Sequence, residues 1–255
     1  MCTIVVLRRP GHRWPLIVGA NRDEMVDRPW APPGRHWPDR PGVVAGLDRL
    51  AGGTWLGLND AGVLAAVANR RGSLGPAAGK ESRGSLPLRA LDHARAAAAA
   101  RELARIDGGR FRAFNLVVAD PEDAFWLANR DGAVTVAPIP EGLSMLTAGD
   151  LDDAASPRIA RFRPRFAAAH APDPDRGDWA AWEALLAATD DAAPASAMTL
   201  YPRNGFATVS SALIALAARG SGVAPIWRFA PGPPDLTAFA PVAIAPARGR
   251  HLRDC

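Results

Sequence analysis

Hydrophobic and polar positions in the first 70 residues alternate in short runs that are typical of β-strands. The apolar runs Thr3–Leu7 and Leu16–Ala20 flank a turn-like insert, Arg8–His12, and predict a hairpin. Further short strands are predicted at Gly53–Leu58 and Gly62–Ala68. The pattern therefore indicates a strand-rich N-terminal part.

Two stretches interrupt this pattern. Residues 29–41 contain five prolines, and we expect no regular structure there because proline fixes φ and lacks an N–H. Residues 71–87 form a Gly/Ser/Pro loop, which is long enough to line a site or to act as a lid. Gly52-Gly53 lacks the Gly-Lys-Ser/Thr ending of a phosphate loop and precedes a strand, so we expect it to let backbone approach a reactive residue closely.

The rest of the chain mixes helices and strands. Leu88–Ile106 is rich in strong helix formers with a weak apolar stripe and predicts one helix. Further helices are predicted at 157–171 and 179–189, and strands at 115–119, 124–128, 133–137, 207–216 and near 225–229. With no repeat and no clear linker, we predict one α+β domain of stacked layers spanning residues 1–255, with the tail after Pro231 on the surface.

Composition narrows the class of protein. The 255 residues are 48% hydrophobic, which supports a sizeable core. The net charge of +4 is carried almost entirely by arginine, since Lys80 is the single lysine. Arginine suits phosphate and carboxylate binding, but codon bias in a GC-rich genome explains the excess equally well. No arginine cluster is dense enough to indicate nucleic-acid binding.

No stretch of about 20 apolar residues exists, so no transmembrane segment is expected. The apolar run behind Cys2 is too short for a signal peptide. Cys2 and Cys255 lie at opposite ends of the chain and do not indicate a disulfide framework, and we expect Cys255 to be an inert thiol. A cytoplasmic protein is predicted, and the oligomeric state stays open.

The first candidate for chemistry is Cys2. Removal of Met1 would place a thiol and a free α-amine on the same residue. The amine titrates near ~8 and the thiol near ~8.5, so each would assist the other near neutral pH. The alternative is that Cys2 is an accident of translation start.

A polar tetrad, Asn21-Arg22-Asp23-Glu24, follows the apolar run Leu16–Ala20. If the strand continues, Asn21 and Asp23 face one side and Arg22 and Glu24 the other. A carboxylate beside arginine stays ionised and would hold an ammonium group, although a solvated turn with local ion pairs explains the tetrad as well.

Two further side chains are candidates. Asn69 ends an apolar strand just before the long loop, where its amide would donate into an oxyanion hole, although a lone asparagine is more often a turn former. Trp55 is either core or the wall of a pocket.

These motifs resemble the NRDE family. The matching segments are Met1-Cys2, Ala20–Glu24, Ala45–Asp48, Gly52–Gly57, Asn59–Gly62 and Asn69, and more loosely the strand around 207–211. The resemblance implies a four-layer αββα sandwich of the N-terminal nucleophile hydrolase type, similar to bile-salt hydrolase and penicillin V acylase.

The same resemblance implies residue roles. Cys2 would be nucleophile and base, Arg22 and Asp23 would position the thiolate and the α-amine, and Asn69 would serve the oxyanion hole. Asn21, Glu24 and Trp55 would contact the ligand. The expected reaction is hydrolysis of a linear amide or a thioester, with an acyl-amide or acyl-CoA as substrate and no required cofactor.

Two positions depart from the hydrolase pattern. The mid-chain Thr-Asn-Ser-Pro segment has its nearest counterpart in Leu146–Asp150, which has no asparagine, and Val209 stands where the family commonly has arginine. A non-catalytic protein that binds and carries haem or acyl-CoA on the same scaffold is therefore the alternative. The five histidines form no metal-spaced pair and no metal is expected, but His12 and His36, placed in loops near the site mouth, are candidate haem ligands.

Overall fold

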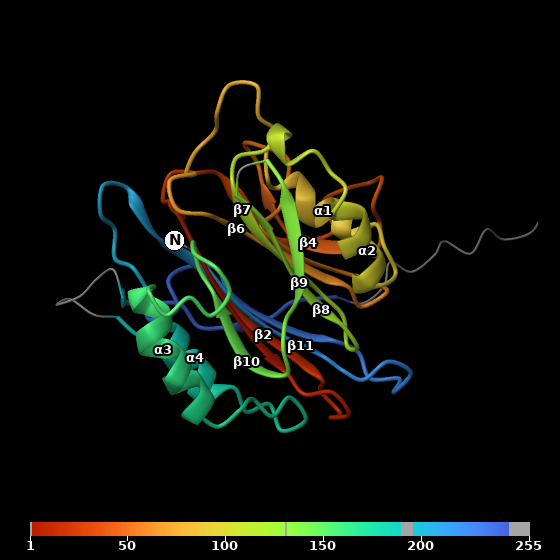
Figure 1. The fold of residues 1–255 in the computed structure, drawn as a ribbon. Coiled ribbons are helices and arrows are strands. Elements are labelled where there is room, and N and C mark those ends of the chain that lie inside the picture. The colour runs from red at the N-terminus through yellow and green to blue at the C-terminus, as the bar shows by residue number, and fades with distance from the viewer. Residues whose placement is uncertain (1, 131, 190–195, 245–255) are drawn as a thin grey trace, which may run out of the picture.

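The computed structural model describes residues 2–130, 132–189 and 196–244. Two β-sheets pack face to face, and a pair of helices covers the outer face of each sheet (Figure 1). Helices α1 and α2 lie against the second sheet, whereas α3 and α4 lie against the first. The chain therefore folds as the predicted four-layer αββα sandwich.

All neighbouring strands are antiparallel. The first sheet has six strands in the spatial order β10 (Gly142–Leu146), β1 (Thr3–Arg8), β2 (Leu16–Met25), β11 (Phe206–Leu216), β12 (Ile226–Ala230) and β13 (Ala240–Pro241). The second has seven in the order β3 (Trp30–Gly34), β4 (Val43–Asp48), β5 (Leu56–Asn59), β6 (Leu64–Asn69), β7 (Phe114–Ala119), β8 (Ala124–Asn129) and β9 (Val134–Pro138). The predicted β1–β2 hairpin and the meander β7–β8–β9 are confirmed.

The helices are short. They are α1 (Ser85–Leu91), α2 (Ala96–Leu103), α3 (Pro157–Ala168) and α4 (Ala180–Leu186), with a 3-10 turn at Gly108–Arg110. The prediction of one helix over Leu88–Ile106 was wrong. Asn59 Nδ2 donates to the carbonyls of Leu91 (2.8 Å) and His93 (2.7 Å) where α1 ends, and Asp120 accepts from the Ala96 N–H (2.9 Å) where α2 begins. The break is set by strand turns distant in sequence.

The expectation of irregular structure over residues 29–41 was also wrong, because β3 lies inside that stretch. Strand β3 is at the edge of its sheet, where a proline that cannot donate costs no ladder hydrogen bond. The register shifts between Ala31 and Gly34, on either side of Pro32 and Pro33. Whereas β3 was predicted to be irregular, β10 was not predicted at all. It is a short edge strand that pairs with β1 and begins at Gly142 with φ +87°.

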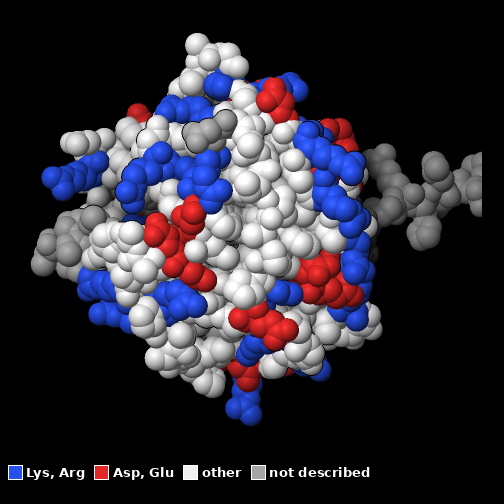
Figure 2. All heavy atoms as spheres, viewed as in Figure 1, with Lys and Arg blue, Asp and Glu red and all other residues white. Residues whose placement is uncertain are grey.

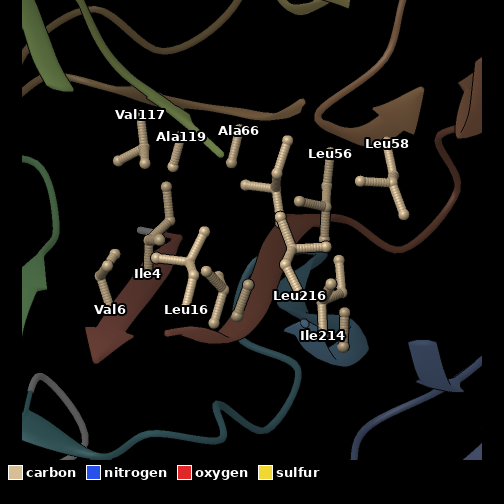
Figure 3. Packing of buried hydrophobic residues seen from close by; sticks show 14 of the residues in the cluster. Ile4, Val6, Leu16, Leu56, Leu58, Ala66, Val117, Ala119, Ile214 and Leu216 are labelled. Atoms are coloured by element: carbon tan, nitrogen blue, oxygen red, sulfur yellow. The ribbon is translucent and has the colours of Figure 1, made fainter. Parts of the chain in front are cut away.

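Three hydrophobic clusters follow the layers: one lies between the sheets and one under each helix pair. Figure 3 shows two facing rows of side chains in the central cluster, with Ile4 and Leu16 opposite Ala66 and Val117. Strand β2 is buried on both faces. Leu16 joins the central cluster and Ile17 the helix-facing one, which explains why its sequence is a continuous apolar run.

Charged side chains on the outside occur in mixed groups. Figure 2 shows basic and acidic residues side by side around a broad uncharged band on the face viewed in Figure 1. Within the described residues, no helix is long and apolar enough to cross a membrane. The same part of the chain contains no group of three or more His, Cys, Asp or Glu side chains able to hold a metal ion.

Candidate active site

A cleft of about 450 Å³ opens at the N-terminal end of β1. The predicted site residues on its lining are Cys2, Arg22, Asp23, Glu24, Trp55 and Asn69. Asn21 does not line it. Residues 75–77 and 80–84 form part of the wall, so the predicted loop 71–87 borders this cleft in part, whereas its last three residues begin α1. This loop is the orange segment that rises as an arch in Figure 1.

Cys2 is partly buried at the point where the chain enters β1. Its Sγ donates to the backbone carbonyl of Asp23 at 3.5 Å. Burial raises the pKa of the thiol and the Asp23 carboxylate raises it further, whereas the N-terminal ammonium group, the hydrogen bond to the Asp23 backbone and the Arg22 guanidinium lower it. The thiol of Cys2 is therefore mostly protonated at neutral pH, and forming the thiolate needs a base or a nearby cation.

The polar tetrad lies within β2, which continues to Met25, so it is not a turn after the strand. Asn21 and Asp23 share one face of the strand, as predicted, and that face is the one toward the helices. Asn21 is 1% exposed, and its Nδ2 donates to the carbonyls of Leu186 and Met198 at 2.9 Å each. Asn21 therefore ties β2 to the end of α4 and the segment that follows it.

Asp23 is held by two donors from distant elements. Thr208 Oγ1 donates to its Oδ1 at 2.7 Å, and the Arg158 guanidinium lies 3.0 Å from its Oδ2. Arg158 comes from α3, is 4% exposed, and also donates to Thr3 Oγ1 at 2.6 Å. A buried ion pair of this kind fixes the carboxylate beside the nucleophile and compensates its charge.

A β-bulge in β11 makes this arrangement possible. The pairing with β2 shifts register between Thr208 and Ser210, which leaves Val209 as the extra residue. Thr208 and Ser211 therefore face the same side although they are three positions apart. Ser211 Oγ donates to Asn21 Oδ1 at 2.6 Å, as Thr208 does to Asp23. Both helix-facing members of the tetrad thus accept a hydrogen bond from a hydroxyl group of β11.

Arg22 points the other way, toward the second sheet. Its guanidinium lies 4.1 Å from the ring centroid of Trp55 and 3.9 Å from Glu24 Oε2. Its side chain is 5% exposed, and its Nη1 is buried with no hydrogen-bond partner among the described residues. Burial lowers the pKa of Arg22, while the neighbouring Cys2 and Glu24 raise it.

Trp55 is packed by a glycine: a Cβ on Gly46 would meet the Trp55 ring at 2.3 Å. The close backbone approach at Gly53 is to Gly84, at the end of the arch. A Cβ on Gly53 would meet the Gly84 carbonyl carbon at 2.5 Å, and the Thr54 N–H donates to Gly84 O at 2.9 Å. The absence of side chains at Gly53 and Gly84 thus lets the backbone at the end of the arch pack closely against the backbone at Gly53.

Asn69 is the last residue of β6 and lines the cleft. Within the described residues its side-chain amide has no recorded hydrogen bond, so it is available to a ligand.

The two histidines suggested as haem ligands do not line the cleft. Placing His12 near the site mouth was wrong, because the β1–β2 hairpin carries it to the far end of the strands from Cys2. His12 Nδ1 accepts from the Trp14 N–H there, and His36 Nε2 lies 2.9 Å from the Pro32 carbonyl.

Sequence reasoning missed several residues of this site. Thr208 and Ser211 lie in the segment that resembles the NRDE family, and that likeness is the signal that points to them. Arg158 and Arg83 carry no such signal, because each reaches the site through a fold contact from a helix or a loop.

No curated protein matches the sequence. Similar solved structures include a Caenorhabditis elegans N-acylethanolamine-hydrolyzing acid amidase ortholog, at 13% identity and a TM-score of 0.54, with 86% of this chain and 95% of that chain covered. Penicillin V acylase from Agrobacterium tumefaciens is 15% identical with a TM-score of 0.56, covering 94% of this chain and 84% of that chain.

The mutant C2A conjugated bile acid hydrolase from Clostridium perfringens is 11% identical with a TM-score of 0.51, covering 90% and 88%. At these identities the likeness establishes the fold, which is that of the N-terminal nucleophile hydrolases. The sequence profile of the family described as Transport and Golgi organisation 2 matches residues 1–219, so the chain belongs to the TANGO2 family.

Proposed function

We propose that the cleft is the active site of a cysteine N-terminal nucleophile hydrolase that cleaves a linear amide or thioester. The observation that carries this proposal is the position of Cys2 on the cleft lining, with Arg22, Asp23 and Asn69 on the same lining. The solved relatives named above are an amidase, an acylase and a hydrolase of conjugated bile acids, and they supply the reaction class by analogy.

Removal of Met1 precedes the reaction and frees the α-amine of Cys2. The amine takes the thiol proton, and the thiolate attacks the substrate carbonyl to form a carbon–sulfur bond. The Asn69 amide donates to the developing oxyanion. The carbon–nitrogen or carbon–sulfur bond of the substrate then breaks, and the leaving group takes the proton from the amine. Water hydrolyses the acyl-thioester and restores the thiol.

Each charged neighbour has a role in this scheme. Arg22 stabilises the thiolate, since its guanidinium favours the charged form of Cys2. Asp23 orients the ammonium group that forms on Cys2, and Arg158 holds the Asp23 carboxylate in place. Glu24 and Trp55 border the substrate. We place this activity in the cytoplasm, where reducing conditions keep Cys2 as a thiol.

The test is a panel of acyl-amides and acyl-CoA thioesters, assayed with the purified protein and with Cys2→Ala. We expect turnover that depends on Cys2 and an acyl adduct at Cys2 by intact-protein mass spectrometry. Equal turnover by the two proteins across the panel would contradict the proposal. A Cys255→Ser background keeps the adduct assignment unambiguous.

A second candidate is a protein that binds and carries haem or acyl-CoA. The observation in its favour is the raised pKa of Cys2, which leaves the thiol protonated, together with the valine in place of the family arginine at position 209. Saturable binding of haem or acyl-CoA that survives Cys2→Ala would support it. Absence of binding at tens of micromolar would contradict it.

A further inference from the structure

The charges that line the cleft are unevenly partnered. Each of its four carboxylates lies within ion-pair distance of an arginine. These pairs are Asp23 with Arg158 (3.0 Å), Asp48 with Arg28 (2.6 Å), Glu24 with Arg28 (3.7 Å), and Glu81 with Arg110. The carboxylates of the cleft are therefore already compensated within the protein.

Three cations on the same lining lack such a partner. Within the described residues no carboxylate oxygen lies within ion-pair distance of Lys80, Arg83 or Arg112. This contrasts with the outer face in Figure 2, where basic and acidic side chains lie side by side. The cleft therefore keeps an excess of positive charge at the arch, the loop 71–87, which itself carries Lys80 and Arg83.

The two arginines are held rigidly by backbone carbonyls. Arg83 Nη1 donates to the carbonyls of Ser73 (2.6 Å) and Ala113 (3.2 Å), and its Nη2 donates to Gly75 O at 3.4 Å. Arg112 Nη2 donates to Gly72 O at 2.8 Å, and its Nη1 donates to Leu74 O. These bonds fix the guanidinium groups but do not neutralise them. The Nε–H of each arginine has no recorded partner among the described residues.

Bringing these cations together costs electrostatic free energy. Burial and the neighbouring Arg112 lower the pKa of Arg83 to about 10. A carbonyl needs only a donor, so anchoring the arch does not require two full charges in one place. An anion in the cleft would offset the repulsion and accept from the Nε–H groups, because charge-assisted hydrogen bonds from guanidinium to carboxylate or phosphate are strong.

A second observation points into the same cleft from its floor. Nη1 of Arg22 is buried without a partner, and the Arg22 side chain is 5% exposed. Most buried donors in proteins have partners, so a buried guanidinium nitrogen without one favours a ligand acceptor.

We propose that the cleft recognises an anionic group of its ligand, a carboxylate or a phosphate, through Arg83 and Arg112 under the arch, while the reacting carbonyl lies at Cys2. This proposal deepens the hydrolase function and depends on it for the role of Cys2 as the reacting group. The substrate class is thereby an acyl compound with a negative charge at a distance from the scissile bond.

The test follows protection of Cys2 from iodoacetamide by intact-protein mass spectrometry, in the Cys255→Ser background. Hexanoate, hexyl phosphate and hexanamide serve as competitors, since they share an apolar chain and differ in head group. We expect half-protection by one of the anions at a concentration about tenfold lower than for hexanamide. The better of the two anions distinguishes a carboxylate from a phosphate ligand.

Variants locate the effect. Arg112→Gln is expected to abolish the preference for anions and Arg112→Lys to retain part of it. Arg101→Gln, on the exposed face of α2, is the matched control and is expected to change nothing. Both arginines also anchor the arch through backbone carbonyls. Arg83→Lys is therefore used at position 83, and at position 112 the charge-keeping Arg112→Lys separates loss of the charge from loosening of the arch. Equal protection by hexanamide and both anions, or an unchanged preference in Arg112→Gln, would overturn the proposal.

The readout is independent of turnover. If the substrate panel shows no hydrolysis and the anion preference persists, the hydrolase function fails and the anion subsite stands. If neutral amides are hydrolysed with no anion preference, the hydrolase function stands and the anion subsite fails. If Cys2 is alkylated too slowly for the protection assay, titration calorimetry with hexyl phosphate and hexanoate measures binding directly. The absence of saturable heat at tens of millimolar of either anion would also overturn the subsite.

Discussion

The two faces of β2 both carry polar side chains, but these side chains differ in how completely the protein supplies their hydrogen-bond partners. On the helix-facing side, Asn21 and Asp23 receive protein partners from α3, β11 and the end of α4. On the cleft side, Arg22 keeps a buried nitrogen with no partner among the described residues, and its nearest carboxylate oxygen, on Glu24, is 3.9 Å away. The hydrogen-bonded groups on the helix side stabilise the fold, whereas the unpartnered nitrogen of Arg22, on the cleft lining, is available to a ligand.

The largest effect is expected from Arg158→Met, which breaks the buried pair on the helix-facing side. Asp23 would keep a buried charge with one partner fewer, so we expect the free energy of unfolding to fall by about 3–5 kcal/mol. Urea denaturation measures the change. Arg165→Met, at an exposed position of the same helix, should stay within about 0.5 kcal/mol. Similar losses in both variants would show that α3 itself, and not the ion pair, is responsible.

A pair of asparagines compares the two sides directly. Asn21→Ala removes three hydrogen bonds and should cost about 1–3 kcal/mol of stability. Asn69→Ala removes none that is recorded, so its stability should change by less than about 0.5 kcal/mol. If the proposed hydrolysis holds, Asn69→Ala should instead slow turnover by about 10²–10³-fold. The opposite assignment of stability and rate would contradict the distinction.

The alternation of β2 was predictable because it depends on local geometry. Side chains of a strand point to opposite sides in turn, so one β-strand sufficed to separate Asn21 from Arg22. The β1–β2 hairpin follows from the same local pattern. The resemblance to a known family supplied the layer order, which no local pattern contains.

Contacts between distant segments explain what the sequence did not predict. The break between α1 and α2 depends on Asn59 and Asp120, and the partner of Asp23 comes from 135 residues along the chain. Strand β3 forms despite its prolines because it lies at an edge. The bulge at Val209 changes which residues of β11 face Asp23, and alternation alone would misplace them.

The aromatic wall of the cleft should show a smaller effect. Trp55→Leu removes the stack on Arg22 and should cost about 1–2 kcal/mol of stability while changing the rate of Cys2 alkylation. Trp126→Leu is a matched control, since its ring stacks on Arg130 at 5.5 Å outside the cleft. We expect Trp126→Leu to leave the alkylation rate unchanged. Equal changes in that rate would mean that Trp55 acts through general stability.

The smallest and most specific effect concerns the pH dependence of Cys2. In protein that keeps Met1, burial and Asp23 hold the pKa of the thiol above its ordinary value, so the thiolate is scarce at neutral pH and alkylation accelerates only as pH rises through the raised value. Arg22→Gln removes a cation that favours the thiolate, and we expect its alkylation midpoint to move further up by less than about one pH unit. Asn21→Ala, on the other side of β2, should leave the midpoint where it is.

Removal of Met1 should lower the midpoint, because an ammonium group then adjoins the thiol. The rate of iodoacetamide labelling against pH measures all four proteins, and equal shifts for Arg22→Gln and Asn21→Ala would mean that the two sides of β2 do not divide function from stability.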